Sequence, residues 1–167
     1  MTVEPTDIHT AYLGLGSNVE DKRENLRLAR VWLQTPAVRI VRESSIYRTS
    51  PVDYLEQDWF FNQVLAVETP LSPEELLAHC LSVEIKIGRE RTFDKGPRTI
   101  DIDLLFYESN VINRFDLVVP HPHLAERKFV LVPMAELAPD FVHPLLMKPI
   151  RTLLAERAND PAKVELL

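Results

Sequence analysis

The chain has 167 residues, 46% of them hydrophobic, and a formal net charge of −6. This length provides one well-buried core, so we expect a single domain over 1–167, with frayed ends at about 1–8 and 158–167. The acidic balance argues against nucleic acid as a partner, so any anion site must be local. Cys80 is the only cysteine, which excludes an internal disulfide and a cysteine-based metal site.

The ends and the hydropathy of the chain predict a cytoplasmic protein. Residues 1–7 lack the basic and apolar regions of a signal peptide. No run approaches the roughly 18 apolar residues of a membrane span. We therefore expect no membrane partner.

The first part of the chain predicts the order β-α-β-β. Asn18 and Asp21 resemble a capping box at a helix start, and Pro36 closes that helix. The expected elements are a strand over 10–15, a helix over about 20–34, a long strand over 38–47, a loop over 48–59 and a strand over 60–69.

Gly14 and Gly16 follow the first strand, but they do not complete a dinucleotide fingerprint. Val19 occupies the position of the third glycine. The two glycines therefore fit a turn with positive φ, or a close approach of the backbone to the sheet.

A second helix begins with Ser72 as N-cap, Pro73 at its first position and Glu75 as the capping-box acid. Gly88 is its expected end. Glu84 lies inside the apolar arc, where it either has a basic partner in the core or faces a ligand pocket. The arc itself comprises Leu76, Leu77, Cys80, Leu81, Val83, Ile85 and Ile87.

The remaining elements complete a β-α-β-β-α-β order. We expect a strand over 100–107, a turn over 108–110, a strand-like piece over 117–119, a rigid extended connector over 120–123 and short helices over 129–137 and 150–157. This order predicts a ferredoxin-like α+β sandwich, with helices stacked on one face of a mainly antiparallel sheet.

Asp101 and Asp103 are the most informative residues. Strand alternation places both carboxylates on one face, about 7 Å apart. Such a pair is either merely exposed at the sheet rim or holds a divalent cation between its oxygens. The upstream Arg98 suits the remaining charge of a magnesium-bound polyphosphate. The opposite face is expected to carry Ile100, Ile102, Leu104 and Phe106.

Three other groups of residues allow more than one interpretation. The basic loop 89–98 is either an ordinary solvated loop or part of an anion site. His121 and His123 have no third zinc ligand at suitable spacing, which favours one histidine donating to a phosphate oxygen near Arg127. The aromatic run 59–61 belongs to the core or rim, or forms a slot for a flat heterocycle.

Six segments together resemble the 6-hydroxymethyl-7,8-dihydropterin pyrophosphokinase family, over about 11–139: 14–18, 47–51, 61–62, 84–91, 96–103 and 119–129. The resemblance implies a monomeric, ferredoxin-like enzyme of folate biosynthesis. Its implied reaction moves the terminal pyrophosphate of ATP onto the pterin hydroxymethyl group and releases AMP. The loop 92–95 is one residue shorter than in some members, and Phe60 replaces a tyrosine.

The resemblance also implies roles for individual residues. Asp101 and Asp103 would hold two Mg²⁺ ions, while Arg89 and Arg98 would stabilise charge on the transferring group. The residues implied for binding ATP are Glu84, Arg91, Arg98, Ile102, His121 and Arg127. Those implied for the pterin pocket are Thr49, Val52, Asn62 and Phe129, with Phe129 stacking on the ring and Asn62 hydrogen bonding to its edge.

Two other functions stay open on the residues alone. One is a different magnesium-dependent nucleotide kinase or hydrolase that uses the same aspartate pair. The other is a non-catalytic ferredoxin-like nucleotide-binding module whose acids hold a structural ion. Without the resemblance, the sequence indicates only magnesium-dependent nucleotide chemistry.

Overall fold

The computed structural model describes residues 7–51, 58–88 and 99–167. Its elements, in chain order, are β1 (His9–Ser17), α1 (Lys22–Leu33), β2 (Arg39–Glu43), β3 (Tyr47–Thr49), β4 (Phe60–Thr69), α2 (Pro73–Ile87), β5 (Asp101–Tyr107), β6 (Ile112–Arg114), β7 (Leu117–Val119), the 3₁₀ helix η1 (Leu124–Glu126), α3 (Lys128–Leu137), α4 (Ile150–Ala155) and β8 (Val164–Leu166).

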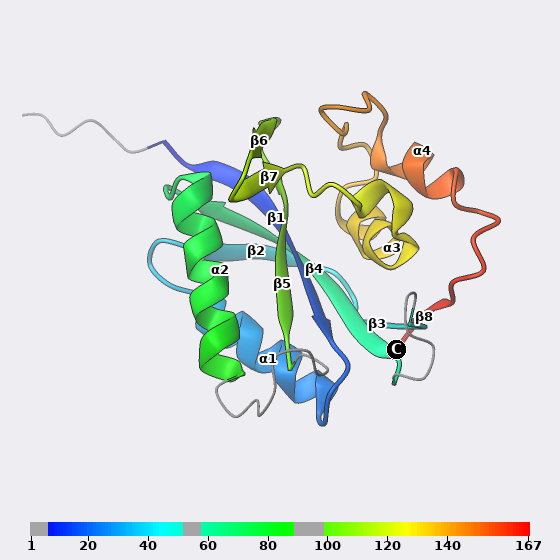
Figure 1. The fold of residues 1–167 in the computed structure, drawn as a ribbon, viewed down its shortest axis with the longest axis horizontal. Helices are drawn as coiled ribbons and strands as arrows, with labels where there is room; N and C mark the ends of the chain where they lie inside the picture. The colour runs from blue at the N-terminus through cyan, green and yellow to red at the C-terminus, as the bar shows by residue number, and fades with distance from the viewer. Residues whose placement is uncertain (1–6, 52–57, 89–98) are drawn as a thin grey trace, which may run out of the picture.

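The main sheet has the strand order β5-β1-β4-β3-β8, and β2 also pairs with β4. All of these pairings are antiparallel. β1 lies between β4 and β5, while α1 and α2 connect the strands of the βαββαβ order (Figure 1). The predicted ferredoxin-like α+β fold is therefore confirmed.

Helices cover both faces of this sheet, not one as predicted. One core lies under α1 and α2 and contains Leu13, Leu65 and Ile102. The other lies under α3 and α4 and contains Val64 and Phe106. The cause can be read in β4, whose run from Val64 to Val67 is apolar without alternation and so needs cover on both sides.

The two long helices begin at side-chain caps. In α2 the predicted capping box is confirmed, because the Ser72 hydroxyl accepts from the Glu75 amide and the Glu75 carboxylate accepts from the Ser72 amide. In α1 the N-cap is Asp21, which accepts from the Glu24 amide, so the predicted role of Asn18 is wrong. The apolar arc of α2 is narrower than predicted, since Leu81 is 48% and Ile85 72% exposed.

The predicted long strand over 38–47 is divided into β2 and β3 by Ser44. The Ser44 amide donates to the carbonyl of Val64, while the Val64 amide donates to the Ser44 hydroxyl rather than to a backbone carbonyl. A side chain thus replaces one step of the backbone ladder. β3 then continues to Thr49, into the segment predicted as a loop.

A bulge in β5 places Phe106 on the face opposite to the one predicted. Leu13 pairs with Leu104 and Tyr12 with Phe106, so Leu105 is the extra residue. Phe106 therefore packs in the α3 core, on the same face as the aspartates. Alternation alone cannot reveal a bulge, which explains the error.

The later segments also differ from prediction. The short strand β6, which pairs with β7, was not expected. The connector 120–123 bends into a turn at its second half instead of remaining extended. α4 ends at Ala155 rather than at residue 157. The end predicted to fray contains β8, which pairs with β3.

Candidate active site

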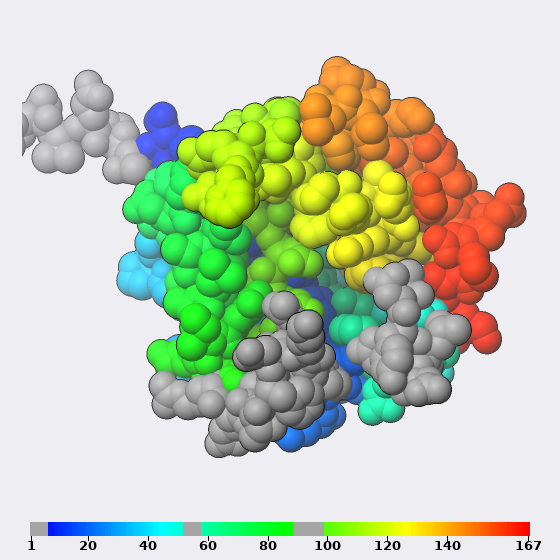
Figure 2. All heavy atoms as spheres, in the orientation of Figure 1, coloured from blue at the N-terminus to red at the C-terminus, as the bar shows by residue number. Residues whose placement is uncertain are grey.

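A cavity of about 530 Å³ lies over the sheet face that η1 and α3 partly cover. Figure 2 shows a hollow on this side between α2 (green) and α3 (yellow). Strand residues at the cavity are Gly14, Leu15, Gly16, Thr49, Phe60, Asn62, Gln63, Val64, Asp101 and Asp103, and Ser50 follows β3. The other wall consists of His123, Glu126, Arg127, Phe129 and Val130.

The strand register forms the cavity floor around two glycines. Gly16 pairs with Asp101 on one side and with Asn62 on the other. Directly paired residues point to the same face, so the missing side chain of Gly16 opens a trough between the carboxylate and the amide. Among the described glycines none has positive φ, which makes the turn interpretation of Gly14 and Gly16 wrong and supports the close-approach interpretation.

Asp101 and Asp103 line the same cavity, as the strand alternation predicts. Within the described residues, no group of three or more His, Cys, Asp and Glu side chains could hold a metal. Zinc at His121 and His123 therefore has no support there. The carboxylate pair nevertheless fits Mg²⁺, which takes one or two carboxylates and completes its shell with phosphate and water oxygens.

Glu84 reaches β5 between the two aspartates. Its Oε1 accepts a hydrogen bond of 2.8 Å from the amide of Ile102. This contact joins two residues that the resemblance assigns to nucleotide binding, although neither is among the cavity-lining residues. Nearby Cys80 is buried, and burial followed by the charges of Glu84 and Asp103 raises the pKa of its thiol to about 12. Cys80 is therefore not a nucleophile.

Thr49, Asn62 and Phe129 also line the cavity, with Thr49 in β3 and Asn62 in β4 on the side of β1 away from the aspartates. The Asn62 side-chain amide donates to the Thr49 hydroxyl at 2.5 Å, and both residues are buried. This bond fixes which way the Asn62 oxygen points. Phe129 lines the cavity from α3, with the guanidinium of Arg127 5.7 Å from its ring centroid.

The predicted aromatic slot uses fewer rings than expected. Phe60 lines the cavity. Phe61 packs against the other core, under α1 and α2. The Trp59 ring lies 4.3 Å from the guanidinium carbon of Arg48. A flat heterocycle in the cavity would therefore meet Phe60 and Phe129.

Arg127 and His121 lie at the η1 end. Arg127 lines the cavity, whereas His121 is half-buried and is not among the lining residues. Burial, and then the charges of Arg127 and His123, lower the pKa of His121 to about 4, so its ring is neutral at pH 7. Its Nδ1 accepts from the His123 amide at 3.3 Å, which leaves the proton on Nε2 as a donor.

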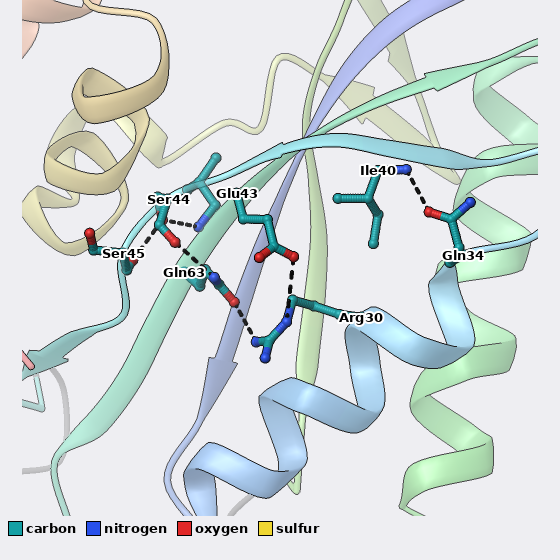
Figure 3. A network of polar contacts seen from close by, with 8 residues as sticks. Arg30, Gln34, Ile40, Glu43, Ser44, Ser45 and Gln63 are labelled. Carbon is teal, nitrogen blue, oxygen red and sulfur yellow. Dashed lines mark hydrogen bonds and ion pairs between the residues drawn. The ribbon is translucent and has the colours of Figure 1, made fainter.

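Figure 3 shows a polar network behind the floor that supports β4. Arg30 of α1 donates to the Gln63 side-chain oxygen at 2.8 Å, and the Gln63 amide nitrogen donates to the Ser44 carbonyl at 2.8 Å. Arg30 also lies 3.6 Å from a carboxylate oxygen of Glu43. Because Gln63 follows Asn62 directly, the network fixes the backbone that carries the cavity amide.

Four predicted site residues, Val52, Arg89, Arg91 and Arg98, lie outside the described residues. The sequence analysis missed Ser50, Gln63 and Glu126 as lining residues. Gln63 stands out as a polar residue inside the apolar strand β4, but alternation from Asn62 turns its side chain toward α1, so the pattern could not have indicated it as a lining residue. In the described part of the chain, no helix is long and apolar enough to cross a membrane.

The model of the 7,8-dihydro-6-hydroxymethylpterin-pyrophosphokinase (HPPK) family matches residues 12–139. A 2-amino-4-hydroxy-6-hydroxymethyldihydropteridine pyrophosphokinase of Methylorubrum extorquens is 47% identical over 156 residues, 93% of this chain and 96% of that protein. The folic acid synthesis protein fol1 of Schizosaccharomyces pombe is 41% identical over 152 residues, 90% of this chain but 21% of that protein. A crystal structure of wild-type Plasmodium falciparum HPPK-DHPS with pterin and p-hydroxybenzoate has a TM-score of 0.73 at 17% identity, covering 94% of this chain and 44% of that one, which supports the fold.

Proposed function

Because the chain belongs to the 7,8-dihydro-6-hydroxymethylpterin-pyrophosphokinase family, we propose that it transfers the terminal pyrophosphate of ATP to 6-hydroxymethyl-7,8-dihydropterin, releases AMP and requires two Mg²⁺ ions. Family membership makes it a pyrophosphokinase of folate biosynthesis with ATP as co-substrate. The metal requirement and the AMP product are our proposals.

One observation carries this proposal: a single cavity has carboxylates at one end and a buried amide with an aromatic ring at the other. Asp101 and Asp103 suit a metal-bound polyphosphate, while Asn62 and Phe129 suit the edge and face of a flat heterocycle. Gly16 separates the two ends without blocking the path between them. A transfer reaction needs its two substrates side by side in this way.

In the proposed mechanism the residues bind and orient, and the substrate hydroxyl is the nucleophile. Its oxygen forms a bond to the β-phosphorus of ATP, the bond from that phosphorus to the α-phosphate oxygen breaks, and AMP leaves. Asp101 and Asp103 would hold the Mg²⁺ ions, whose charge would offset that of the phosphates and would favour loss of the hydroxyl proton to water. No protein nucleophile is needed.

Other side chains supply charge and position. The Arg127 guanidinium would pair with phosphate oxygens, and the neutral His121 ring would donate from Nε2. We assign Arg89, Arg91 and Arg98 to the same phosphates by family resemblance. Thr49 would orient Asn62 toward the pterin edge, with Phe129 against its ring and Val52 completing the pocket. Glu84 and Ile102 would border the nucleotide.

The test is to mix the purified protein with magnesium, ATP and the dihydropterin, and then to separate the nucleotides by chromatography. AMP together with pyrophosphorylated pterin supports the proposal. ADP would indicate a kinase, phosphate formed without pterin would indicate a hydrolase, and tight ATP binding without AMP would indicate a binding module. Removal of magnesium with a chelator should abolish AMP formation.

Aspartate variants test the metal ligands directly. We expect Asp101→Asn and Asp103→Asn to remain folded, because the asparagine side chain has nearly the shape of the aspartate that it replaces. Both variants should lose most turnover, because a neutral amide binds Mg²⁺ poorly. Circular dichroism checks the fold and AMP release measures turnover. Normal activity in either variant would contradict the metal assignment.

We also propose that residues 1–167 act as a single monomeric domain in the cytoplasm. The Methylorubrum extorquens relative, covered over 96% of its length, supports a single domain for the matched residues. Light scattering coupled to size-exclusion chromatography tests the proposal, which predicts the mass of one chain.

A further inference from the structure

Residues 162–167 form the outer edge of the sheet next to the Thr49 end of the cavity. β8 pairs with β3 in antiparallel register, with Thr49 opposite Val164. Beyond the ladder, the Ser50 amide donates to the Lys163 carbonyl at 3.0 Å, and the Lys163 amide donates to the Ser50 hydroxyl at 3.0 Å. Figure 1 shows the red segment running from α4 past α3 to β3.

The same segment contacts two elements that carry lining residues of the cavity, β3 and α3. The Lys128 ammonium donates to the Ala162 carbonyl at 3.5 Å, and Lys128 directly precedes Phe129 in α3. On the β3 side, Glu165 lies 3.4 Å from a guanidinium nitrogen of Arg48, which directly precedes Thr49. The segment therefore links β3, which carries Thr49, to the helix that carries Phe129.

Burial of apolar surface does not explain this segment. Leu166 is 68% exposed and Leu167 45% exposed, so the strand adds little to either core. Its main contacts are backbone hydrogen bonds to residues 46–50. These bonds fix the backbone at Thr49, whose hydroxyl in turn accepts from the Asn62 amide.

We propose that residues 162–167 are a positioning element for the pterin end of the cavity. They hold Thr49 and Ser50 in place, and through Thr49 they orient Asn62. The proposal rests on the assignment of this end to the pterin in the proposed function. It predicts that loosening β8 weakens pterin binding and leaves ATP binding unchanged.

The main test compares Lys163→Pro with Lys163→Ala. Proline removes the amide that donates to Ser50, while alanine keeps it. Both variants lose the same Lys163 side chain, which is exposed in the wild-type protein. For Lys163→Pro we expect a pterin KM roughly threefold to tenfold higher, the range of one lost hydrogen bond. The ATP KM and kcat should match those of Lys163→Ala, and both KM values of Lys163→Ala should match wild type.

Three outcomes are decisive for this comparison. Equal pterin KM values in the two variants would overturn the inference while the proposed function stands. A rise in both the pterin KM and the ATP KM together with a fall in kcat would also overturn it, because such a general loss of activity would show that the strand is merely structural. Absence of AMP formation by the wild-type protein would overturn the proposed function itself.

A measurement on the wild-type protein covers the case in which Lys163→Pro does not fold. Coupling is reciprocal, so pterin binding should stabilise β8. The Leu167 amide donates to the Ile46 carbonyl at 3.1 Å, at the far end of the pairing. Its hydrogen exchange should slow when pterin saturates the protein and stay constant with a nonhydrolysable ATP analogue alone. Unchanged exchange with pterin would overturn the inference.

Discussion

Gly16→Ala should destabilise the protein through a single clash at the centre of the cavity floor. A Cβ at position 16 would lie 2.8 Å from the side-chain oxygen of Asn62, closer than a carbon and an oxygen can approach. Asn62 cannot yield freely, because its amide nitrogen is bonded to Thr49 at 2.5 Å. The substitution must therefore break this bond or separate β1 from β4.

The size of the destabilisation follows from the less costly of these two responses, which is rotation of the Asn62 side chain away from Thr49. Leaving buried polar groups without their partner costs about 1–3 kcal/mol. Replacing a strand glycine by alanine returns roughly 0.5–1 kcal/mol of conformational entropy. The expected net loss of unfolding free energy is about 0–2.5 kcal/mol, with a middle value of about 1 kcal/mol. Because Asn62 would also leave its orientation, the pterin KM should rise roughly tenfold for each 1.4 kcal/mol lost at the site.

Gly14→Ala is the matched control. A Cβ at position 14 would lie 3.3 Å from the end of the Leu105 side chain, which can shift by a few tenths of an ångström. We therefore expect Gly14→Ala to be near neutral or stabilising by up to about 1 kcal/mol. The two glycines occupy the same strand and face, so only the identity of the neighbour differs.

A double-mutant cycle by urea unfolding isolates the clash. In an Asn62→Ala background the new Cβ has no neighbour closer than about 3.9 Å, the distance to the Phe60 ring carbon Cδ1 and an ordinary contact. Gly16→Ala should then become neutral or stabilising, which gives a coupling of about 1–3 kcal/mol between positions 16 and 62. Additivity within about 0.5 kcal/mol would refute the reasoning.

Two further predictions concern stability. The pKa of His121 falls from its ordinary 6.5 to about 4 on folding, so the unfolded chain binds the proton first as the pH drops, and unfolding free energy should decrease between about pH 6.5 and pH 4. In His121→Asn this decrease should be shallower. A remainder should come from His143, because burial also lowers the pKa of that ring. An unchanged dependence of unfolding free energy on pH, measured by urea titration, would contradict the pKa assignment. Ser72→Ala removes the hydroxyl that accepts from the Glu75 amide and keeps the Ser72 amide that donates to the Glu75 carboxylate. It should lower unfolding free energy by about 1 kcal/mol, with Ser82→Ala as an exposed control on the same helix; equal stability of the two variants would contradict the capping role.

The fold was predictable where local signals are strong. Ser72, Pro73 and Gly88 bound α2 as expected, and the apolar run 60–69 is β4 with the predicted limits. The division of β2 from β3 was not predictable, since it depends on the Ser44 hydroxyl meeting Val64, twenty residues away in the chain. The β5 bulge likewise arises from pairing with β1.

The candidate site shows the same division. Alternation sufficed to place Asp101 and Asp103 on one face, and the resemblance joined Thr49, Asn62 and Phe129, which the structure brings to one cavity. The role of Gly16 could not be deduced from the sequence, because it depends on a cross-strand neighbour. β8 was missed for another reason: its three residues, Val-Glu-Leu, are too few for alternation to indicate a strand, and its bonds are made by the backbone.

In two central strands, β4 and β5, one half lines the cavity and the other half packs in a core. In β4, Asn62 lines the cavity, and Ala66, four residues later on the same face, packs in the α3 core. The same handover occurs in β5 between Asp103 and Phe106. Binding groups and densely packed core residues thus share one continuous backbone. Substitutions in the cavity half of each strand should mainly reduce activity, while those in the core half should mainly reduce stability. The boundary between the two effects falls inside the strand.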